Sequence, residues 1–386
     1  MTFKNLIKKI HLWLGLSSGL IVIILGITGC LYVFEEELRP IVYEYYYVDQ
    51  VKTKKLPVSQ LIKIAEEANA KAHPNQKLSG ARIINDDKRT VIVWFFEELD
   101  KDAIWYWNRY QNTYVYINPY TGSVQKLEEY NFEFFVFVRM LHQTLCLNSE
   151  IGDPIVGTAT IIFIISLITG LILWWPKNKQ AAKQRFWFRW KNTTQWKRKN
   201  YDLHNILGYY MMFFALIIAL TGLVWAFECY DKGVQWIFNG GKTIEKVKLV
   251  SDTTQYNVKT ATDKIFIATK KANPKAKSYY LFIPKADDSL ATFQTFVRYK
   301  NRFDDISMEF DRYTAKNLRT ITYNDKSGGE KFRFINYDLH VGSILGFPGK
   351  VLAFFASLVS ASLPITGFLI WWGRNNKKKK TLAKSS

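Results

Sequence analysis

Four long runs of apolar residues divide the chain into alternating apolar and polar segments. They cover Leu12 to Phe34, Ile155 to Trp175, Ile206 to Phe227 and Val351 to Trp372, and none contains a charged residue. A helix of about 20 apolar residues crosses the hydrocarbon core of a bilayer. We therefore predict four transmembrane helices. The first run is expected to be retained rather than cleaved as a secretory signal, because a signal has a shorter apolar core and ends in small residues.

Two long polar segments lie between these runs, at about residues 36–140 and 229–336. Helix-compatible stretches near their starts are Val58 to Lys71 and Lys259 to Lys271. Strand-like alternation follows at Thr90 to Phe96, Tyr114 to Asn118 and Thr292 to Tyr299. Turn residues separate these runs, as in Asn118-Pro119-Tyr120-Thr121-Gly122. We predict a small α+β domain with an antiparallel sheet in each polar segment.

Charge suggests how the helices are oriented. The net charge is +20, and basic residues gather between the second and third runs and in the tail from Arg374 onward. Lys and Arg favour the cytoplasmic side of a membrane. Both termini are therefore expected in the cytoplasm, and the segments that begin Glu35-Glu36-Glu37 and Glu228 on the opposite side. Membrane topology accounts for the charge, so no nucleic-acid partner is predicted.

The chain contains an internal duplication. His11 and His204, Gly15 and Gly208, and the Thr-Gly pairs at 28–29 and 221–222 are all displaced by 193 residues. The repeating unit is span, polar domain, span, and both copies start on the cytoplasmic side, so the repeats are parallel. The predicted fold is thus a membrane protein with a four-transmembrane-helix bundle from two tandem parallel repeats and two periplasmic α+β domains. Its segments are 1–35, 36–140, 141–176, 177–202, 203–228, 229–336, 337–373 and 374–386.

The duplication also orders the histidines. His11 and His204 begin spans one and three at the cytoplasmic face, whereas His142 and His340 precede spans two and four at the outer face. His73 has no counterpart. The string NYDLH occurs at 200–204 and at 336–340, and we expect its aspartate to cap a helix that starts with the histidine in its first turn.

Two histidines on each face favour haem over zinc or copper, which normally take three or four protein ligands at one point. Two imidazoles suit the axial positions of a haem iron, and the absence of a C-x-x-C-H motif makes any haem non-covalent and b-type. The alternative is that each histidine is an interfacial side chain bonded to a carbonyl. The cofactor prediction is two haem b groups with bis-histidine iron, held by His11, His204, His142 and His340.

Glycines stand at the same four levels. Gly29, Gly222, Gly170 and Gly367 lie where the other two helices bring their histidines, and a backbone without side chains would make room for a macrocycle. The alternative is ordinary small-residue helix packing. Candidate partners of the haem propionates are Lys8, Lys9, Arg198, Lys199, Arg139 and Arg333.

These motifs resemble a known family. His11, Gly15, Thr28 and Gly29, the Leu141-His142 pair and the Thr169 to Pro176 ending are similar to PepSY-associated transmembrane proteins, and Tyr116 to Gly122 resembles PepSY domains. Within the family the chain is similar to bacterial inner-membrane siderophore-iron reductases, including the ferrioxamine type. The resemblance implies a di-haem b oxidoreductase of the inner membrane. It would carry electrons outward to reduce an Fe(III)-siderophore, or another ferric chelate, in the periplasm and so release Fe(II) for iron uptake.

Two other functions stay open from the sequence. The PepSY-like domains could bind a peptide or regulate a protease while the spans only anchor them. Parallel repeats and Pro364 within span four could suit a transporter, although no charged residue lies at mid-depth in the spans. For the reductase, no dinucleotide fingerprint is present, so an unknown cytoplasmic donor or membrane quinol would supply the electrons.

Overall fold

The computed structural model describes residues 2–48, 51–176, 178–245, 247–255, 261–285, 287–300 and 302–385, without the side chains of 181, 255 and 377–385. The chain forms two compact units. The helical unit contains Met1–Glu35, Phe137–Gln235 and Phe332–Ser386, and the sheet unit contains Glu36–Val136 and Trp236–Lys331. The basic residue Lys177, the start of the predicted 259–271 helix and the side chains of Lys377 to Lys380 in the basic tail lie outside the described parts.

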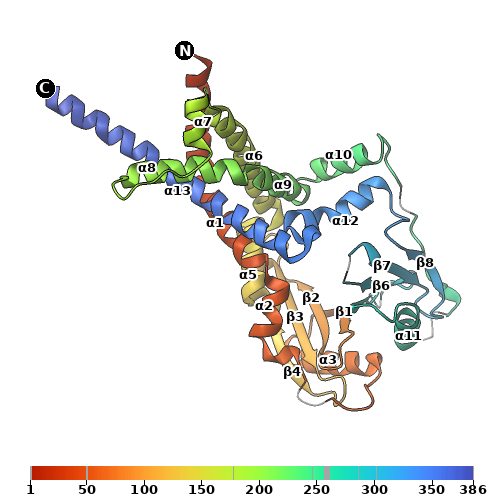
Figure 1. Cartoon of the computed structure of the whole chain (residues 1–386). Coiled ribbons are helices and arrows are strands. Elements are labelled where there is room, and N and C mark those ends of the chain that lie inside the picture. Colours follow the sequence, from red (N-terminus) through yellow and green to blue (C-terminus); the bar gives the residue numbers. More distant parts are fainter. Residues whose placement is uncertain are drawn as a thin grey trace. The chain divides into compact units, whose positions relative to one another are not determined.

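Among the described residues, four helices are long and apolar enough to cross a membrane: Phe3–Tyr32, Ser149–Trp174, Trp196–Ala226 and Ser343–Asn376. They correspond to α1 (Phe3–Tyr32), α6 (Ser149–Trp174), the continuous run α8 (Trp196–Asp202), η3 (Leu203–Leu207) and α9 (Gly208–Ala226), and α13 (Gly346–Ser385) with the short turn η6 (Ser343–Leu345) before it. Each helix contains one of the four predicted apolar runs almost entirely. The helices α1 and α9 each pack against both α6 and α13 (Figure 1).

Shorter helices precede or follow the four long ones. They are α2 (Glu35–Val42), α5 (Phe134–Thr144), α7 (Lys179–Arg185), α10 (Glu228–Phe238) and α12 (Gly328–His340). Between α5 and α6, Leu145 and Cys146 have positive φ angles of 56° and 62°, and Asn148 caps α6 by accepting a bond from the amide of Ile151. Gly342 and Gly346, with φ of 76° and 67°, make the corresponding break between α12 and α13.

The sheet unit contains one eight-stranded antiparallel sheet in the order β4-β3-β2-β1-β5-β6-β7-β8. Its strands are β1 (Lys77–Ile84), β2 (Val91–Glu98), β3 (Tyr110–Ile117), β4 (Val124–Glu129), β5 (Ser278–Phe282), β6 (Phe293–Arg298), β7 (Ile306–Phe310) and β8 (Asn317–Ile321). The first four strands follow helix α3 (Val58–Ala72), and the last four follow α11 (Thr262–Ala272). Short elements complete the unit: η1 (Glu44–Tyr46), α4 (Tyr106–Arg109), η2 (Tyr130–Phe132), η4 (Thr253–Gln255) and η5 (Arg302–Asp304).

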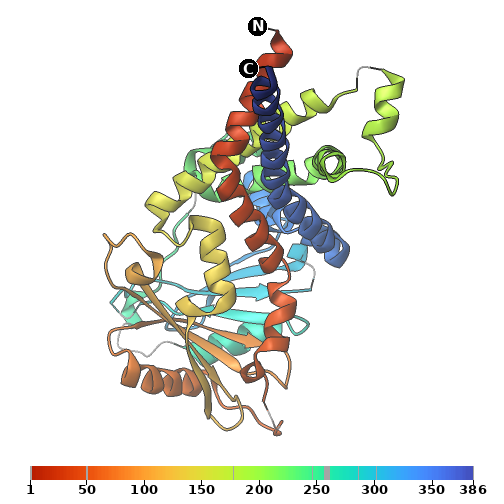
Figure 2. The same ribbon diagram turned by 90° about the vertical axis from the view of Figure 1, so that its left-hand side faces the viewer.

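The two polar segments therefore share one sheet instead of forming two separate sheets. Strands β1 and β5 pair at the seam, with Ala81 opposite Leu281 and Arg82 opposite Tyr280. Figure 2 shows the strands of both segments side by side in the sheet unit. The expected helices and strands match α3, α11, β2, β3 and β6 to within a few residues. The joining was not predicted.

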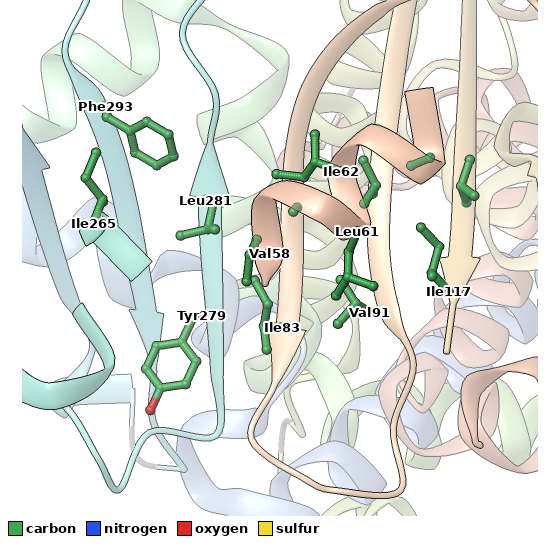
Figure 3. Packing of buried hydrophobic residues seen from close by; sticks show 14 of the residues in the cluster. Val58, Leu61, Ile62, Ile83, Val91, Ile117, Ile265, Tyr279, Leu281 and Phe293 are labelled. Atoms are coloured by element: carbon green, nitrogen blue, oxygen red, sulfur yellow. The ribbon is translucent and has the colours of Figure 1, made fainter. Parts of the chain in front are cut away.

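One hydrophobic core runs across the seam. Helices α3 and α11 cover the same face of the sheet, and the amide of Ser59 in α3 donates to Oδ1 of Asp263 in α11 over 2.9 Å. Leu61 from α3 and Ile265 from α11 are almost fully buried in this core (Figure 3). Burial of a large aliphatic side chain contributes about 1.5–3 kcal/mol. The core thus stabilises both halves of the sheet together.

The turns after β3 and β7 have the same geometry despite different sequences. Asn118 Oδ1 accepts bonds from the amides of Tyr120 and Thr121, and Asp311 Oδ1 does the same for Tyr313 and Thr314. Gly122 has φ of 77° in the first turn, and Ala315 has φ of 62° in the second. The second segment therefore keeps the turn although alanine replaces the glycine, at some cost in backbone strain.

Two local predictions are wrong. The NYDLH aspartates do not cap helices that start at the histidines, because His340 ends α12 and His204 lies in the π-helical turn η3. Asp202 instead accepts bonds from Trp190 and Arg198, and Asp338 accepts one from Ser343. A short polar segment such as NYDL beside an apolar run is consistent with either the start or the end of a helix, because sequence alone does not define helix boundaries closely.

Candidate functional site

The four histidines predicted as ligands lie in two pairs within the helical unit. The rings of His11 in α1 and His204 in η3 have centroids 6.4 Å apart and an interplanar angle of 82°. The rings of His142 in α5 and His340 in α12 have centroids 6.1 Å apart and an angle of 75°. Each pair takes one histidine from each half of the chain. His73 belongs to the sheet unit, where its Nδ1 is 3.2 Å from Nε2 of Gln111.

This spacing matches two imidazoles that share one metal ion. A metal ion binds an imidazole nitrogen at about 2.0–2.1 Å, and the ring centroid lies about 1.1 Å behind that nitrogen, so two rings on opposite sides have centroids roughly 6.3 Å apart. Both pairs are within a few tenths of an ångström of this value. Among the described residues, no group of three or more His, Cys, Asp and Glu side chains could hold a metal ion. The centroid spacing of each pair is thus compatible with two imidazoles on one metal ion.

A threonine hydroxyl fixes the tautomer of each ring. The Nδ1 atoms lie 3.1 Å from Oγ1 of Thr169 for His11, 3.0 Å from Thr28 for His142, 2.9 Å from Thr366 for His204 and 3.0 Å from Thr221 for His340. Each hydroxyl donates its own proton to the carbonyl four residues earlier in its helix, at 2.7 or 2.8 Å. The threonine oxygen can then only accept, so Nδ1 carries the ring proton and Nε2 keeps the free electron pair.

His11 provides independent support for this tautomer. Its Nδ1 also lies 3.1 Å from the backbone carbonyl of Ser166, which can only accept a hydrogen bond. The sequence had identified the Thr-Gly pairs but assigned the role to glycine alone. The threonines were missed because a hydroxyl within a helix normally bonds to its own backbone, and the second contact depends on packing.

The four predicted glycines each face one histidine ring. A Cβ atom at Gly170 would lie 3.2 Å from Cε1 of His11, and at Gly367 it would lie 3.2 Å from Cε1 of His204. The corresponding distances are 3.5 Å from Gly29 to His142 and 3.3 Å from Gly222 to His340. We expected these glycines to make room for a macrocycle. In the structure, a side chain at Gly170, Gly222 or Gly367 would first meet the imidazole, whereas one at Gly29 would first meet the Ser357 hydroxyl at 3.3 Å.

The cations proposed as propionate partners differ in their surroundings. Arg198 is paired with Asp202 at 3.0 Å, and Arg333 is paired with Asp231. Lys199 lies over the ring of Trp190, 5.7 Å from its centroid. Lys8 and Lys9 are exposed, and Arg139 is half-buried three residues before His142. Trp174 is buried and stacked on Tyr209, with ring centroids 3.7 Å apart.

A second cluster of buried polar side chains lies in the sheet unit. Glu128 in β4 accepts hydrogen bonds from the hydroxyls of Tyr45 and Tyr116, the latter at 3.0 Å. Burial raises the pKa of the Glu128 carboxyl above its ordinary value, although the two tyrosine hydroxyls oppose this effect. Nearby in the same unit, Arg39 forms a 2.7 Å ion pair with Glu133, with side-chain exposures of 8% and 1%. Full satisfaction of these groups indicates a structural role.

Comparison with known proteins identifies one family. Residues 8–374 match the family model described as the PepSY-associated TM region. A search of curated proteins found no match. The matched range includes all four histidines, their threonines and the whole of the sheet unit.

Proposed function

Since the chain belongs to the PepSY-associated transmembrane family, we propose that it is a di-haem b membrane oxidoreductase that reduces a ferric chelate. The observation that carries this proposal is the spacing of the two histidine pairs, at 6.4 and 6.1 Å between ring centroids. Each pair offers two Nε2 atoms, and the described part of the chain adds no third metal-binding side chain, so the two imidazoles of a pair would hold one haem iron.

The chain's own residues would prepare both centres in the same way. The four threonines hold the rings in the tautomer that leaves Nε2 free, and the four glycines let each ring lie against the neighbouring helix. A hydrogen bond at Nδ1 increases the basicity of the ligating nitrogen and fixes the orientation of the ring. When bound, haem supplies one-electron transfer, which is what conversion of Fe(III) to Fe(II) requires.

The direction of transfer follows from the charge distribution. The basic link between α6 and α8 and the basic tail favour a cytoplasmic location. The His11–His204 pair lies close in sequence to these basic segments, and the His142–His340 pair follows the two segments of the sheet unit. Electrons would therefore enter at His11–His204 from a cytoplasmic donor or a membrane quinol. They would leave at His142–His340 toward a ferric siderophore on the periplasmic side of a bacterial inner membrane.

Absorption spectroscopy of the purified protein tests the proposal. The wild type is expected to show a Soret band and, after reduction, α-bands from two b-type haems. His11→Ala and His340→Ala should each remove about one of the two haems, and the double variant should remove both, whereas His73→Ala should keep both. A folded, colourless wild-type protein from haem-replete cells would refute the proposal, as would His11→Ala with its full haem content.

The activity itself needs a second measurement. Dithionite-reduced protein in detergent is expected to be reoxidised by a ferric hydroxamate chelate, with Fe(II) trapped by ferrozine. His340→Ala should slow this reoxidation strongly. Reoxidation that is unchanged in a variant lacking the His142–His340 haem would contradict the assigned exit side.

A further inference from the structure

The two NYDLH segments make the same contact through their first residue. Asn200 Nδ2 donates to the backbone carbonyl of Thr366 over 3.0 Å, and Asn336 Nδ2 donates to the carbonyl of Thr221 over 3.1 Å. The two asparagines are buried, at 4% and 1% exposure. Thr366 and Thr221 are also the residues whose hydroxyls accept from the histidines of the same segments.

Each segment therefore forms two hydrogen bonds with one threonine. The asparagine and the histidine are four residues apart, which places them on the same face of a helix. The asparagine binds the carbonyl of the threonine and the histidine binds its hydroxyl. The glycine after each threonine lies against Cε1 of the same histidine. The asparagine thus holds the helix turn that carries both contacts of the ring.

Only one histidine of each pair has such an asparagine four residues before it. Four residues before His11 is Ile7, and four residues before His142 is Val138, and neither side chain can donate a hydrogen bond. Each pair consequently has one ring whose threonine is also bound by an asparagine and one ring whose threonine lacks this contact. Both clamped rings belong to the second half of the duplicated sequence.

A role in packing alone does not account for the choice of asparagine. Burying a carboxamide costs free energy unless its groups are bonded, and Oδ1 of both Asn200 and Asn336 is buried with no hydrogen-bond partner among the described residues. Leucine would fill a similar volume without this cost. What asparagine adds is the donated bond to the threonine carbonyl.

We propose that Asn200 and Asn336 are positioning residues that fix the orientation of His204 and His340 by clamping the facing threonine. The measurements on bound haem described below rest on the proposed function. The orientation of the His204 or His340 ring should therefore depend on the asparagine of its own segment. The orientation of the other ring of the pair should not.

The test uses full-length protein with ¹⁵N-labelled histidine, compared by solid-state NMR in Asn336→Leu, Asn200→Leu and wild type. Each variant is expected to shift the Nδ1 signal of one histidine, His340 or His204 respectively. Asn205→Leu is the matched control, because Asn205 Nδ2 bonds to the carbonyl of Tyr201 within its own helix. If a leucine variant fails to fold, Asn336→Ala and Asn200→Ala remove the donor with a smaller side chain.

In haem-loaded protein, the same variants should change the low-spin EPR signal of one centre each and lower haem retention there by roughly 10-fold. Histidine signals that match wild type in both leucine variants would overturn the clamp, as would equal shifts in Asn205→Leu. A wild type without haem would refute the proposed function alone, because the NMR comparison would still decide whether the clamp exists.

Discussion

Replacing Thr221 by valine would remove one hydrogen bond and leave the shape of the site almost unchanged. The Thr221 hydroxyl oxygen lies 3.0 Å from Nδ1 of His340, and its proton is directed 2.7 Å away to the carbonyl of Ile217. Thr221 is buried, so water cannot take the place of the lost acceptor. Thr221→Ser keeps the oxygen and serves as the control.

The expected size follows from the strength of one such bond. A neutral hydrogen bond contributes about 0.5–1.5 kcal/mol net. In the proposed haem-loaded protein, the bond would make His340 a more basic ligand and would therefore stabilise Fe(III) over Fe(II). If about 0.5–1 kcal/mol of the bond discriminates between the two oxidation states, its loss raises the midpoint potential by roughly 20–40 mV, since 59 mV corresponds to a tenfold change for one electron.

A spectroelectrochemical titration that resolves two components would measure this shift. Thr221→Val and Thr28→Val should raise the potential of the same component, because both threonines serve the His142–His340 pair. Thr169→Val and Thr366→Val should raise the other component. The reasoning is refuted if Thr221→Val and Thr169→Val move one and the same component, or if Thr221→Ser shifts the potential as much as valine does.

Three further predictions concern the stability of the sheet unit, measured by urea unfolding of the full-length protein. Gly80→Val should cost about 1–3 kcal/mol or more, because a Cβ there would strike the indole of Trp94, and an unchanged midpoint would contradict this. Arg39→Met should cost about 3–5 kcal/mol by removing the ion partner of the buried Glu133. Glu133 also accepts bonds from Tyr43 and from the amides of Phe135 and Val136, so the double variant with Glu133→Leu should cost less than the sum of the two single variants, and additive costs would argue against the pair. The raised pKa of Glu128 contributes stability that is complete below its ordinary pKa of 4.5 and is lost as pH rises, so Glu128→Gln should gain relative to wild type between pH 4.5 and neutral pH; a pH-independent difference would exclude this linkage.

The sequence predicted two histidines at each face but left open which histidine pairs with which and how the rings are held. The apolar runs set the depth of each histidine, and the displacement of 193 residues showed that His11 and His204 occupy equivalent positions. The bonds from the rings to the threonines depend on which helices pack side by side, and an apolar run carries no information about its neighbours. The place of His340 at the end of α12 was missed for a related reason, because α12 has few apolar residues and no long run.

The sequence could not predict that the two sets of strands form one sheet, for a different reason. Strand pairing depends on side-chain fit between neighbours, and β1 and β5 are separated by nearly two hundred residues. An alternating pattern identifies β2 or β6 as a strand but leaves its partner unspecified. The turn at Asp311, in contrast, depends on residues close together in the chain. The Asp311 carboxylate accepts bonds from the amides of Tyr313 and Thr314, and these bonds are sufficient for the turn without a glycine.

The strand order of the sheet is symmetric about the β1–β5 pair, and this symmetry suggests an evolutionary origin for the chain. With β1 and β5 at the centre, each set of four strands completes the open edge of the other. Two identical half-length polypeptides could have met along this same edge as a symmetric dimer before their genes were fused. Severing the present chain between α6 and α8 should therefore yield fragments that reassociate when produced together, and that aggregate through the bared edges of β1 or β5 when produced apart.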